Sequence, residues 1–209
     1  MSELISILNK KNIEHVVNDN GSINVLGDLN LWRSNITSLP EGLSVGGSLY
    51  LEGTGITALP EGLSVGGSLD LEGTGITALP EGLSVGGSLY LEGTGITALP
   101  EGLSVGGSLY LEGTGITALP DNFNCDSLYI DPEHFSNVAF RENCGYSSRT
   151  IFASWVGGNF KIAAGCFFDT IDKFEDAVDD SYDGDAAETY KNHARDCVFD
   201  LTAKLNKAG

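Results

Sequence analysis

The stretch at 91–110, LEGTGITALPEGLSVGGSLY, decides the fold of this chain because it is one copy of a tandem repeat. The same residues occupy 71–90 without change, and they occupy 51–70 with one change, Asp70 in place of tyrosine. Diverged copies stand on either side, at 31–50 and 111–130. A strict period near 20 residues is typical of a solenoid, in which each unit forms one coil and packs on its neighbours.

The apolar positions of the unit indicate which kind of solenoid to expect. Each copy reads L-x-L-x-x-T-x-I-x-x-L-P, as in Leu69, Leu71, Thr74 and Ile76, and ends in Leu-Pro. This pattern resembles the leucine-rich repeat, L-x-L-x-x-N-x-L-x-x-L-P, in particular the short bacterial kind. The resemblance covers about half of the chain and implies an α/β solenoid, in which Leu69 and Leu71 point inward from a strand of three or four residues and their equivalents stack about 4.8 Å apart.

The chain departs from the leucine-rich repeat at the position where that family normally has asparagine. Hydroxyl residues stand there instead, and we expect them to form a hydroxyl ladder that satisfies fewer backbone groups than an asparagine ladder: Ser34, Thr54, Thr74, Thr94 and Thr114. Paired glycines such as Gly66-Gly67, together with the Gly-Thr-Gly triplets, are predicted to supply turns with positive φ.

Three domains are predicted: an N-terminal helical cap at 1–21, the leucine-rich repeat solenoid at 22–131 and a small C-terminal α+β domain at 132–209. The prediction of the cap is based on apolar residues that recur near helical spacing within residues 2–18. In the C-terminal domain, two β-rich runs at 149–156 and 160–167 flank Gly157-Gly158-Asn159, a hairpin signal. Helices are expected after Thr170 and at about 185–206, giving the order ββαα. Several phage and prophage proteins resemble this join of near-identical repeats to a short tail.

The net charge excludes one way of binding anionic partners, and the acidic residues without neighbouring cations are concentrated in the repeats. The 209 residues include 29 acidic and 11 basic residues, a net charge of −18, so binding to nucleic acid or anionic lipid through a general basic surface is excluded. Residues 49–128 contain ten acidic residues and no lysine or arginine. No apolar run approaches a transmembrane length, and no secretory signal is recognised. The four cysteines are scattered, which favours reduced thiols. We therefore expect a cytoplasmic protein, located in a bacterial host if it is phage-encoded.

No constellation of residues predicts catalysis, a cofactor or a metal. The three histidines, His15, His134 and His193, lie in separate segments, and the glycines form no phosphate-binding motif. Some bacterial effectors with this kind of repeat carry a ubiquitin-ligase domain with a cysteine nucleophile, but the tail is far shorter and Cys197 is expected on a buried helix face. The acidic run at 176–185 lacks the ligand spacing of a calcium loop.

The outward-facing strand positions supply the candidate site. Between the buried leucines we expect one column of mostly tyrosines on the concave face: Asn30, Tyr50, Asp70, Tyr90, Tyr110 and Tyr129. A second column is mostly carboxylates: Trp32, Glu52, Glu72, Glu92, Glu112 and Asp131. Tyrosine gives a large contact area at low entropic cost, and a carboxylate column without cations favours a protein partner with a basic patch.

Several interpretations remain open from the sequence. The first is a non-enzymatic binding protein which, if the resemblance to phage proteins holds, is a phage-encoded inhibitor that occupies the nucleic-acid groove of a host defence or nucleic-acid-binding protein. In the second, the repeats are a scaffold and the C-terminal domain carries the activity, through exposed Trp155 or Arg149. A third is a structural or virion-associated protein. Another interpretation is that the acidic columns are by-products of duplication that keep the solenoid soluble. It also covers a further acidic column, which consists of Glu41, Glu61, Glu81, Glu101 and Asp121.

Overall fold

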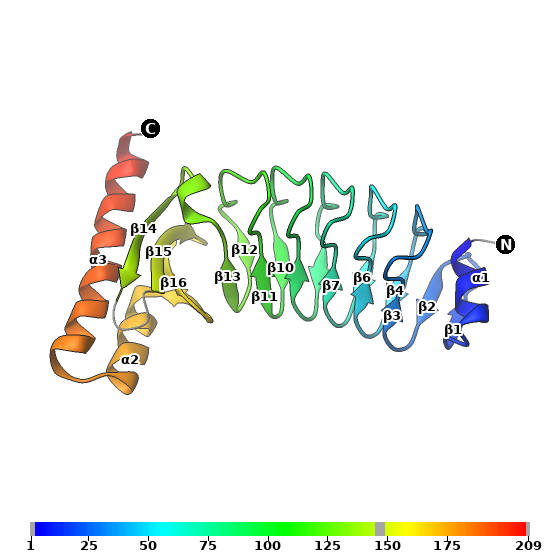
Figure 1. Cartoon of the computed structure of the whole chain (residues 1–209), viewed down its shortest axis with the longest axis horizontal. Coiled ribbons are helices and arrows are strands. Elements are labelled where there is room, and N and C mark those ends of the chain that lie inside the picture. The colour runs from blue at the N-terminus through cyan, green and yellow to red at the C-terminus, as the bar shows by residue number, and fades with distance from the viewer. Residues whose placement is uncertain (1–2, 145–148, 208–209) are drawn as a thin grey trace.

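The chain forms an elongated solenoid with a different element at each end (Figure 1). A computed structural model describes residues 3–144 and 149–207. The solenoid has about five turns; helix α1 (Glu3–Lys10) lies at its N-terminal end, and a sheet with two helices lies at the other. The parts of the predicted N-terminal cap and C-terminal domain that fall on 1–2, 145–148 and 208–209 lie outside the described residues.

Each coil contributes two short strands, and these build two sheets along the solenoid. The first sheet has the order β1-β2-β4-β6-β8-β10-β12, and its strands are β1 (His15–Val17), β2 (Ile23–Val25), β4 (Ser44–Val45), β6 (Ser64–Val65), β8 (Ser84–Val85), β10 (Leu103–Val105) and β12 (Phe123–Asn124). The second sheet has the order β13-β11-β9-β7-β5-β3, and its strands are β3 (Leu29–Asn30), β5 (Leu49–Tyr50), β7 (Leu69–Asp70), β9 (Leu89–Tyr90), β11 (Ser108–Tyr110) and β13 (Ser127–Tyr129). Apart from the antiparallel pair β1–β2, neighbouring strands of these two sheets are parallel and in register.

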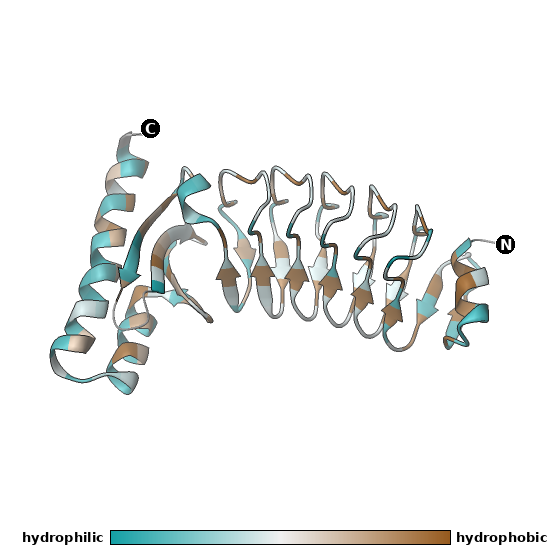
Figure 2. Cartoon of the chain, viewed as in Figure 1, coloured by the Kyte–Doolittle hydropathy of each residue, from teal (hydrophilic) through white to brown (hydrophobic). Residues whose placement is uncertain are grey.

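The inward positions of every coil form one continuous core. Leu69, Leu71 and Ile76 are 0% exposed, and their equivalents in the other coils lie in the same hydrophobic cluster. Figure 2 shows these hydrophobic residues in bands that align from one strand to the next. The predicted inward direction of Leu69 and Leu71 is confirmed, although the strand β7 that contains Leu69 has only two residues. Burying one such leucine contributes about 2 kcal/mol, so stacking identical coils stabilises strands that are too short to persist alone.

The threonines of the expected hydroxyl ladder bond the backbone within their own coil, whereas the buried Ser34 hydroxyl has no hydrogen-bond partner among the described residues. Thr74 Oγ1 donates to the Leu71 carbonyl at 2.7 Å, and Thr54, Thr94 and Thr114 repeat this bond. Serines form the ladder between coils instead. The Ser68 hydroxyl accepts the backbone N–H of Ser88 at 3.0 Å, the same bond recurs in the adjacent coils, and Asp28 accepts the first N–H of the series.

The glycines of the coil have two separate roles. Gly73, the first glycine of a Gly-Thr-Gly triplet, has a φ of +62°, as the sequence predicts, whereas Gly75 at the end of the triplet does not have a positive φ. The paired glycines do not have positive φ; they are required because adjacent backbones approach too closely for a side chain. A Cβ at Gly86 would lie 2.1 Å from the carbonyl oxygen of Gly66, which no real contact permits.

The N-terminal segment is less helical than predicted. The helix ends at Lys10, Asn12 adopts a φ of +53°, and residues 15–17 form the strand β1. The β-branched pair Val16-Val17 favours the extended conformation. Leu4 and Leu8 of α1 are fully buried in the same cluster as the solenoid leucines.

The C-terminal unit contains four strands before its two helices, so the predicted order ββαα is incomplete. A 3₁₀ turn at Pro132–His134 leads into the antiparallel sheet β14-β15-β16-β17 and then α2 (Ile171–Ser181) and α3 (Gly184–Lys207); the strands are β14 (Val138–Cys144), β15 (Arg149–Val156), β16 (Asn159–Ala164) and β17 (Phe167–Thr170). The predicted hairpin is confirmed, with Val156 paired to Asn159 across Gly157-Gly158, both of positive φ. Trp155 is not exposed at its tip: the ring is half-buried, edge-on to Phe160 with centroids 4.6 Å apart.

The four-stranded sheet joins the solenoid to the helices through its two faces. Phe152 and Phe168 belong to the solenoid cluster, whereas Ile151 and Ala153 belong to a second cluster with α2 and α3. Phe168 also stacks on Phe123 of the last coil with centroids 5.9 Å apart. The sheet therefore covers the end of the solenoid on one face and supports the helices on the other.

The close approach of the coils gives a test by substitution. We expect Gly86→Ala to lower the free energy of unfolding by about 3 kcal/mol, because the new Cβ forces two coils apart. The matched variant Gly82→Ala meets no atom within 4 Å but keeps a φ of +68°, so we expect a loss of about 1 kcal/mol. Urea unfolding followed by circular dichroism measures both losses. Equal losses in the two variants would contradict the steric role of Gly86.

Cysteine burial gives a second test. Cys166 is exposed, whereas Cys125, Cys144 and Cys197 are buried, and burial raises the pKa of Cys125 and of Cys197 to about 12. Because the thiolate is the reactive form, a colorimetric thiol reagent at pH 7.5 should modify Cys166 rapidly in the native protein and all four cysteines in 6 M guanidinium. A Cys166→Ser variant is the control, and rapid reaction of that native variant would contradict this burial pattern.

Candidate functional site

The second sheet presents the predicted tyrosine column on its outer surface. In-register pairing aligns Tyr50 with Asp70, Asp70 with Tyr90, and Tyr110 with Tyr129. Each of these residues is half-buried and adjoins a leucine that is buried in the core. Asn30 pairs with Tyr50 at the N-terminal end of the column and is exposed.

Three of the tyrosines form a stack. The ring centroids of Tyr90 and Tyr110 lie 4.7 Å apart with 9° between the planes, and those of Tyr110 and Tyr129 lie 4.6 Å apart with 5°. The parallel strands set this spacing, since neighbouring strands lie about 4.8 Å apart. The stack is a continuous aromatic surface with a phenolic hydroxyl on each ring.

Asp70 separates Tyr50 from this stack and forms a hydrogen bond within its own turn. Its Oδ1 accepts the backbone N–H of Glu72 at 3.0 Å. Asn30 makes the equivalent bond to the N–H of Trp32, also at 3.0 Å. The one difference between the central repeats is therefore explained in part by a turn bond that tyrosine cannot make.

The carboxylate column runs beside the tyrosines and contains neighbouring like charges. The pKa of Glu92 is raised by burial and then by the nearby carboxylates Glu72, Glu112 and Asp70. Burial and Asp131 raise the pKa of Glu112. The pKa of Asp70 is likewise raised, by burial first and then by Glu52.

No cation neutralises this column within the described residues. All the ion pairs among the described residues belong to the C-terminal unit, and their cations are Arg141, Lys173, Lys191 and Arg195. Glu92 Oε2 is buried and has no hydrogen-bond partner in the described part of the chain. At the N-terminal end, Trp32 is 49% exposed, and the Arg33 guanidinium lies 4.5 Å from its ring centroid.

The further acidic column occupies a different part of the coil. Its members precede the strands of the first sheet and are all exposed: Glu41, Glu61, Glu81, Glu101 and Asp121. Glu101 accepts the backbone N–H of Asn122 at 3.1 Å. Each glutamate of this column stands between a proline and a glycine, whereas the carboxylate column of the second sheet runs beside the tyrosines. The further acidic column therefore serves as an internal comparison for the tyrosine-lined face, which is the surface formed by the tyrosine and carboxylate columns.

The structure adds a hollow that the repeat pattern could not predict. A pocket of about 210 Å³ lies where the tyrosine column meets the C-terminal sheet, lined in part by Glu112, Tyr129, Thr150 and Phe152. Thr150 and Phe152 come from β15, outside the repeats, and no sequence signal connects them to Tyr129. The face of the second sheet thus ends in a recess.

The structure also describes the residues that the sequence raised as candidates for catalysis and for metal binding. Cys197 is 0% exposed, and its raised pKa keeps the thiol protonated at neutral pH. Residues 176–185 form the end of α2, two linking residues and the start of α3. Across residues 3–144 and 149–207, no group of three or more His, Cys, Asp or Glu side chains is placed to hold a metal ion. Within the same ranges, no helix has both the length and the apolar character needed to span a membrane.

Comparisons of the chain with protein-family models, with curated proteins and with solved structures gave no match.

Burial and charge crowding at Glu92 together give a pH-dependent test. Since its pKa is higher in the folded chain than its ordinary value of 4.5, ionisation of Glu92 disfavours folding above the raised pKa. We expect Glu92→Gln to raise the free energy of unfolding by about 0.5 to 1 kcal/mol at pH 7 and low salt. This gain should shrink as the pH falls through the raised pKa and vanish below 4.5, where the wild-type carboxyl is protonated in both states.

The matched control is Glu81→Gln, which removes an exposed carboxylate from the further acidic column. Thermal unfolding between pH 3.5 and 7.5 measures both variants against the wild type. A gain for Glu92→Gln that is independent of pH, or no larger than that of Glu81→Gln, would contradict charge crowding on the tyrosine-lined face.

Proposed function

We propose that this protein is a non-enzymatic binding protein whose tyrosine and carboxylate columns hold a protein partner with a basic patch. The observation that carries the proposal is the pairing of an aromatic stack with a crowded carboxylate column that has no cation among the described residues. Lysine and arginine side chains of a partner would relieve the repulsion, and the tyrosine rings would supply contact area and cation–π attraction.

The proposal extends to the class of solenoid and to its ends. The L-x-L and Leu-Pro pattern, with its leucines buried in the core, supports assignment to the leucine-rich repeats. On this proposal α1 is the N-terminal cap, supported by the burial of Leu4 and Leu8. Free cysteines fit a reducing cytoplasm, in a bacterial host if the resemblance to phage repeat proteins holds.

A partner that itself binds nucleic acid fits this surface best. Carboxylates repeated about every 4.8 Å on a rigid scaffold have a spacing between the axial and the along-strand spacings of nucleic-acid phosphates, so they mimic a strand approximately. The protein would then act as an inhibitor by occupying the basic groove of a host defence or nucleic-acid-handling protein.

A salt-dependent pull-down from bacterial lysate tests the proposal. We expect the wild-type chain to retain a basic protein at low salt and to release it as the ionic strength rises toward 0.5 M, because screening weakens charge pairing. The double variant Tyr90→Ala, Glu92→Lys should lose that protein by tenfold or more, since it removes a ring from the stack and reverses a charge.

Glu81→Lys is the matched control, because it makes the same charge change on the further acidic column. The surface proposal fails when Glu81→Lys weakens capture as much as the double variant does, since net charge alone then accounts for binding. It also fails when the double variant retains the partner.

A second candidate places a binding or enzymatic activity in the C-terminal unit. The observation in its favour is that this unit has a hydrophobic cluster of its own, separate from that of the solenoid. Deletion of residues 71–90 discriminates between the two candidates, because a scaffold tolerates the loss of one coil whereas a binding face loses affinity.

A further inference from the structure

The C-terminal unit contains a pocket of about 150 Å³ between the sheet edge, α2 and the start of α3. We name it the tail pocket. It has an apolar side formed by Phe167, Phe174 and Val178, and a polar side formed by Arg149, Tyr182 and Tyr190. It lies outside the tyrosine-lined face, so the proposed function does not use it.

The apolar side fits one ring or a short hydrocarbon chain. Phe174 and Val178 lie one turn apart on α2, and each is 4% exposed. Phe167 meets Phe174 edge-to-face with centroids 5.4 Å apart. A cavity of this volume with such walls accommodates a group the size of benzene.

The polar side brings together one cation and two phenols. The ring centroids of Tyr182 and Tyr190 lie 4.7 Å apart, and the neighbouring Tyr190 raises the pKa of Tyr182. Arg149 is near enough to oppose that rise. The Arg149 side chain is exposed and belongs to none of the ion pairs found among the described residues.

A free guanidinium beside phenol hydroxyls is suited to a carboxylate, which accepts paired hydrogen bonds from arginine. Most of the net charge of −18 lies far from the pocket and is largely screened beyond about 8 Å at physiological salt. The acidic run at 176–185 contributes lining residues, so the contact with Arg149 has to outweigh repulsion from its carboxylates.

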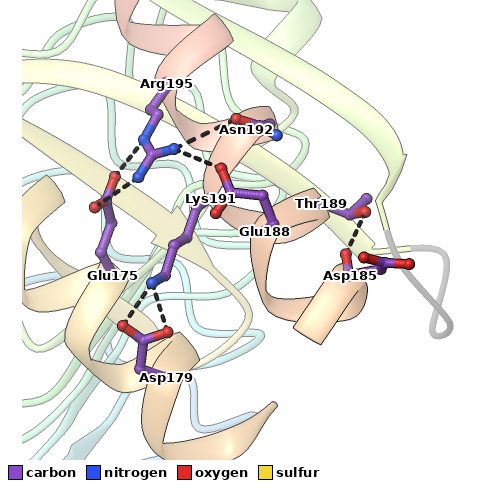
Figure 3. A network of polar contacts seen from close by, with 8 residues as sticks. All are labelled: Glu175, Asp179, Asp185, Glu188, Thr189, Lys191, Asn192 and Arg195. Atoms are coloured by element: carbon purple, nitrogen blue, oxygen red, sulfur yellow. Dashed lines mark hydrogen bonds and ion pairs between the residues drawn. The ribbon is translucent and has the colours of Figure 1, made fainter. Parts of the chain in front are cut away.

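A network of ion pairs holds the two helices that form the wall of the pocket (Figure 3). Arg195 of α3 donates to both carboxylate oxygens of Glu175 on α2, at 2.8 and 3.0 Å, and to Glu188 at 2.9 Å. Lys191 Nζ lies 2.5 Å from the Asp179 carboxylate. These ion pairs link α2 to α3 at the wall of the pocket, and a wall with fixed helices lowers the entropic cost of binding.

We propose that the tail pocket binds a small organic carboxylate, with its ring or short chain against Phe174 and Val178 and its carboxylate on Arg149. Phenylacetate is the simplest probe, and phenylacetamide is its neutral counterpart.

Titration of the full-length ¹⁵N-labelled protein tests the proposal. We expect phenylacetate to shift backbone amide signals of Ala177, Val178 and Tyr182, and phenylacetamide to bind about tenfold more weakly because it lacks the charge-assisted bond to Arg149. Arg149→Gln should reduce phenylacetate affinity to that of the amide. Lys173→Gln is the matched control: it removes an exposed cation from α2 outside the pocket, and we expect wild-type affinity.

Ala177→Phe fills the pocket and should abolish binding of both probes. Absence of shifts in the wild type, equal affinity for acid and amide, or unchanged phenylacetate affinity in Arg149→Gln would each overturn the proposal. The comparison of the two probes on the wild-type protein needs no substitution, so it decides the matter even where a variant fails to fold. None of these outcomes affects capture of a basic protein by the tyrosine-lined face.

Discussion

The close, in-register contact between the backbones of successive coils is the constraint on which the rest of this structure depends. At the paired glycines the backbones come so near that no side chain fits between them, as at Gly86 over Gly66. The strands of both sheets then pair without any shift, so each residue lies over its counterpart in the previous repeat. Leucine stacks on leucine, and serine bonds to serine. The interior and the surface are fixed by the same alignment.

This alignment favours some side chains and penalises others. Stacked leucines gain from burial and stacked tyrosines from ring contact, whereas stacked glutamates repel one another. The raised pKa of Glu92 reflects burial first and that repulsion second. Because the hydrophobic stack supplies several kcal/mol for each coil, it outweighs a repulsion of about 1 kcal/mol between neighbouring carboxylates. The fold thus holds a charged surface that isolated strands would not tolerate.

The sequence predicts the repeating part well because its period is strict and every coil meets the same environment. The directions of Leu69 and Leu71 and the order of the tyrosine column follow from alternation alone. Hydrogen-bond partners do not, since a hydroxyl finds its acceptor by local geometry: threonine bonds to its own coil and serine to the next.

Prediction is weaker in the C-terminal unit for identifiable reasons. The strand β14 contains polar residues and an irregular register between Arg141 and Cys144, which hides the alternation of a strand. The strand β17 has only four residues. The tail pocket arises where three separate elements meet, so no local pattern marks it.

The exact copies at 71–90 and 91–110 have a consequence for how the protein can vary. A coil gained or lost there leaves every contact at the two ends unchanged, because each copy presents the same upper and lower surface to its neighbours. The length of the solenoid can therefore change in steps of about 4.8 Å, with no adjustment in α1 or in the C-terminal sheet. The number of coils can therefore be inherited independently of the stability of the solenoid and of the residues at its two ends.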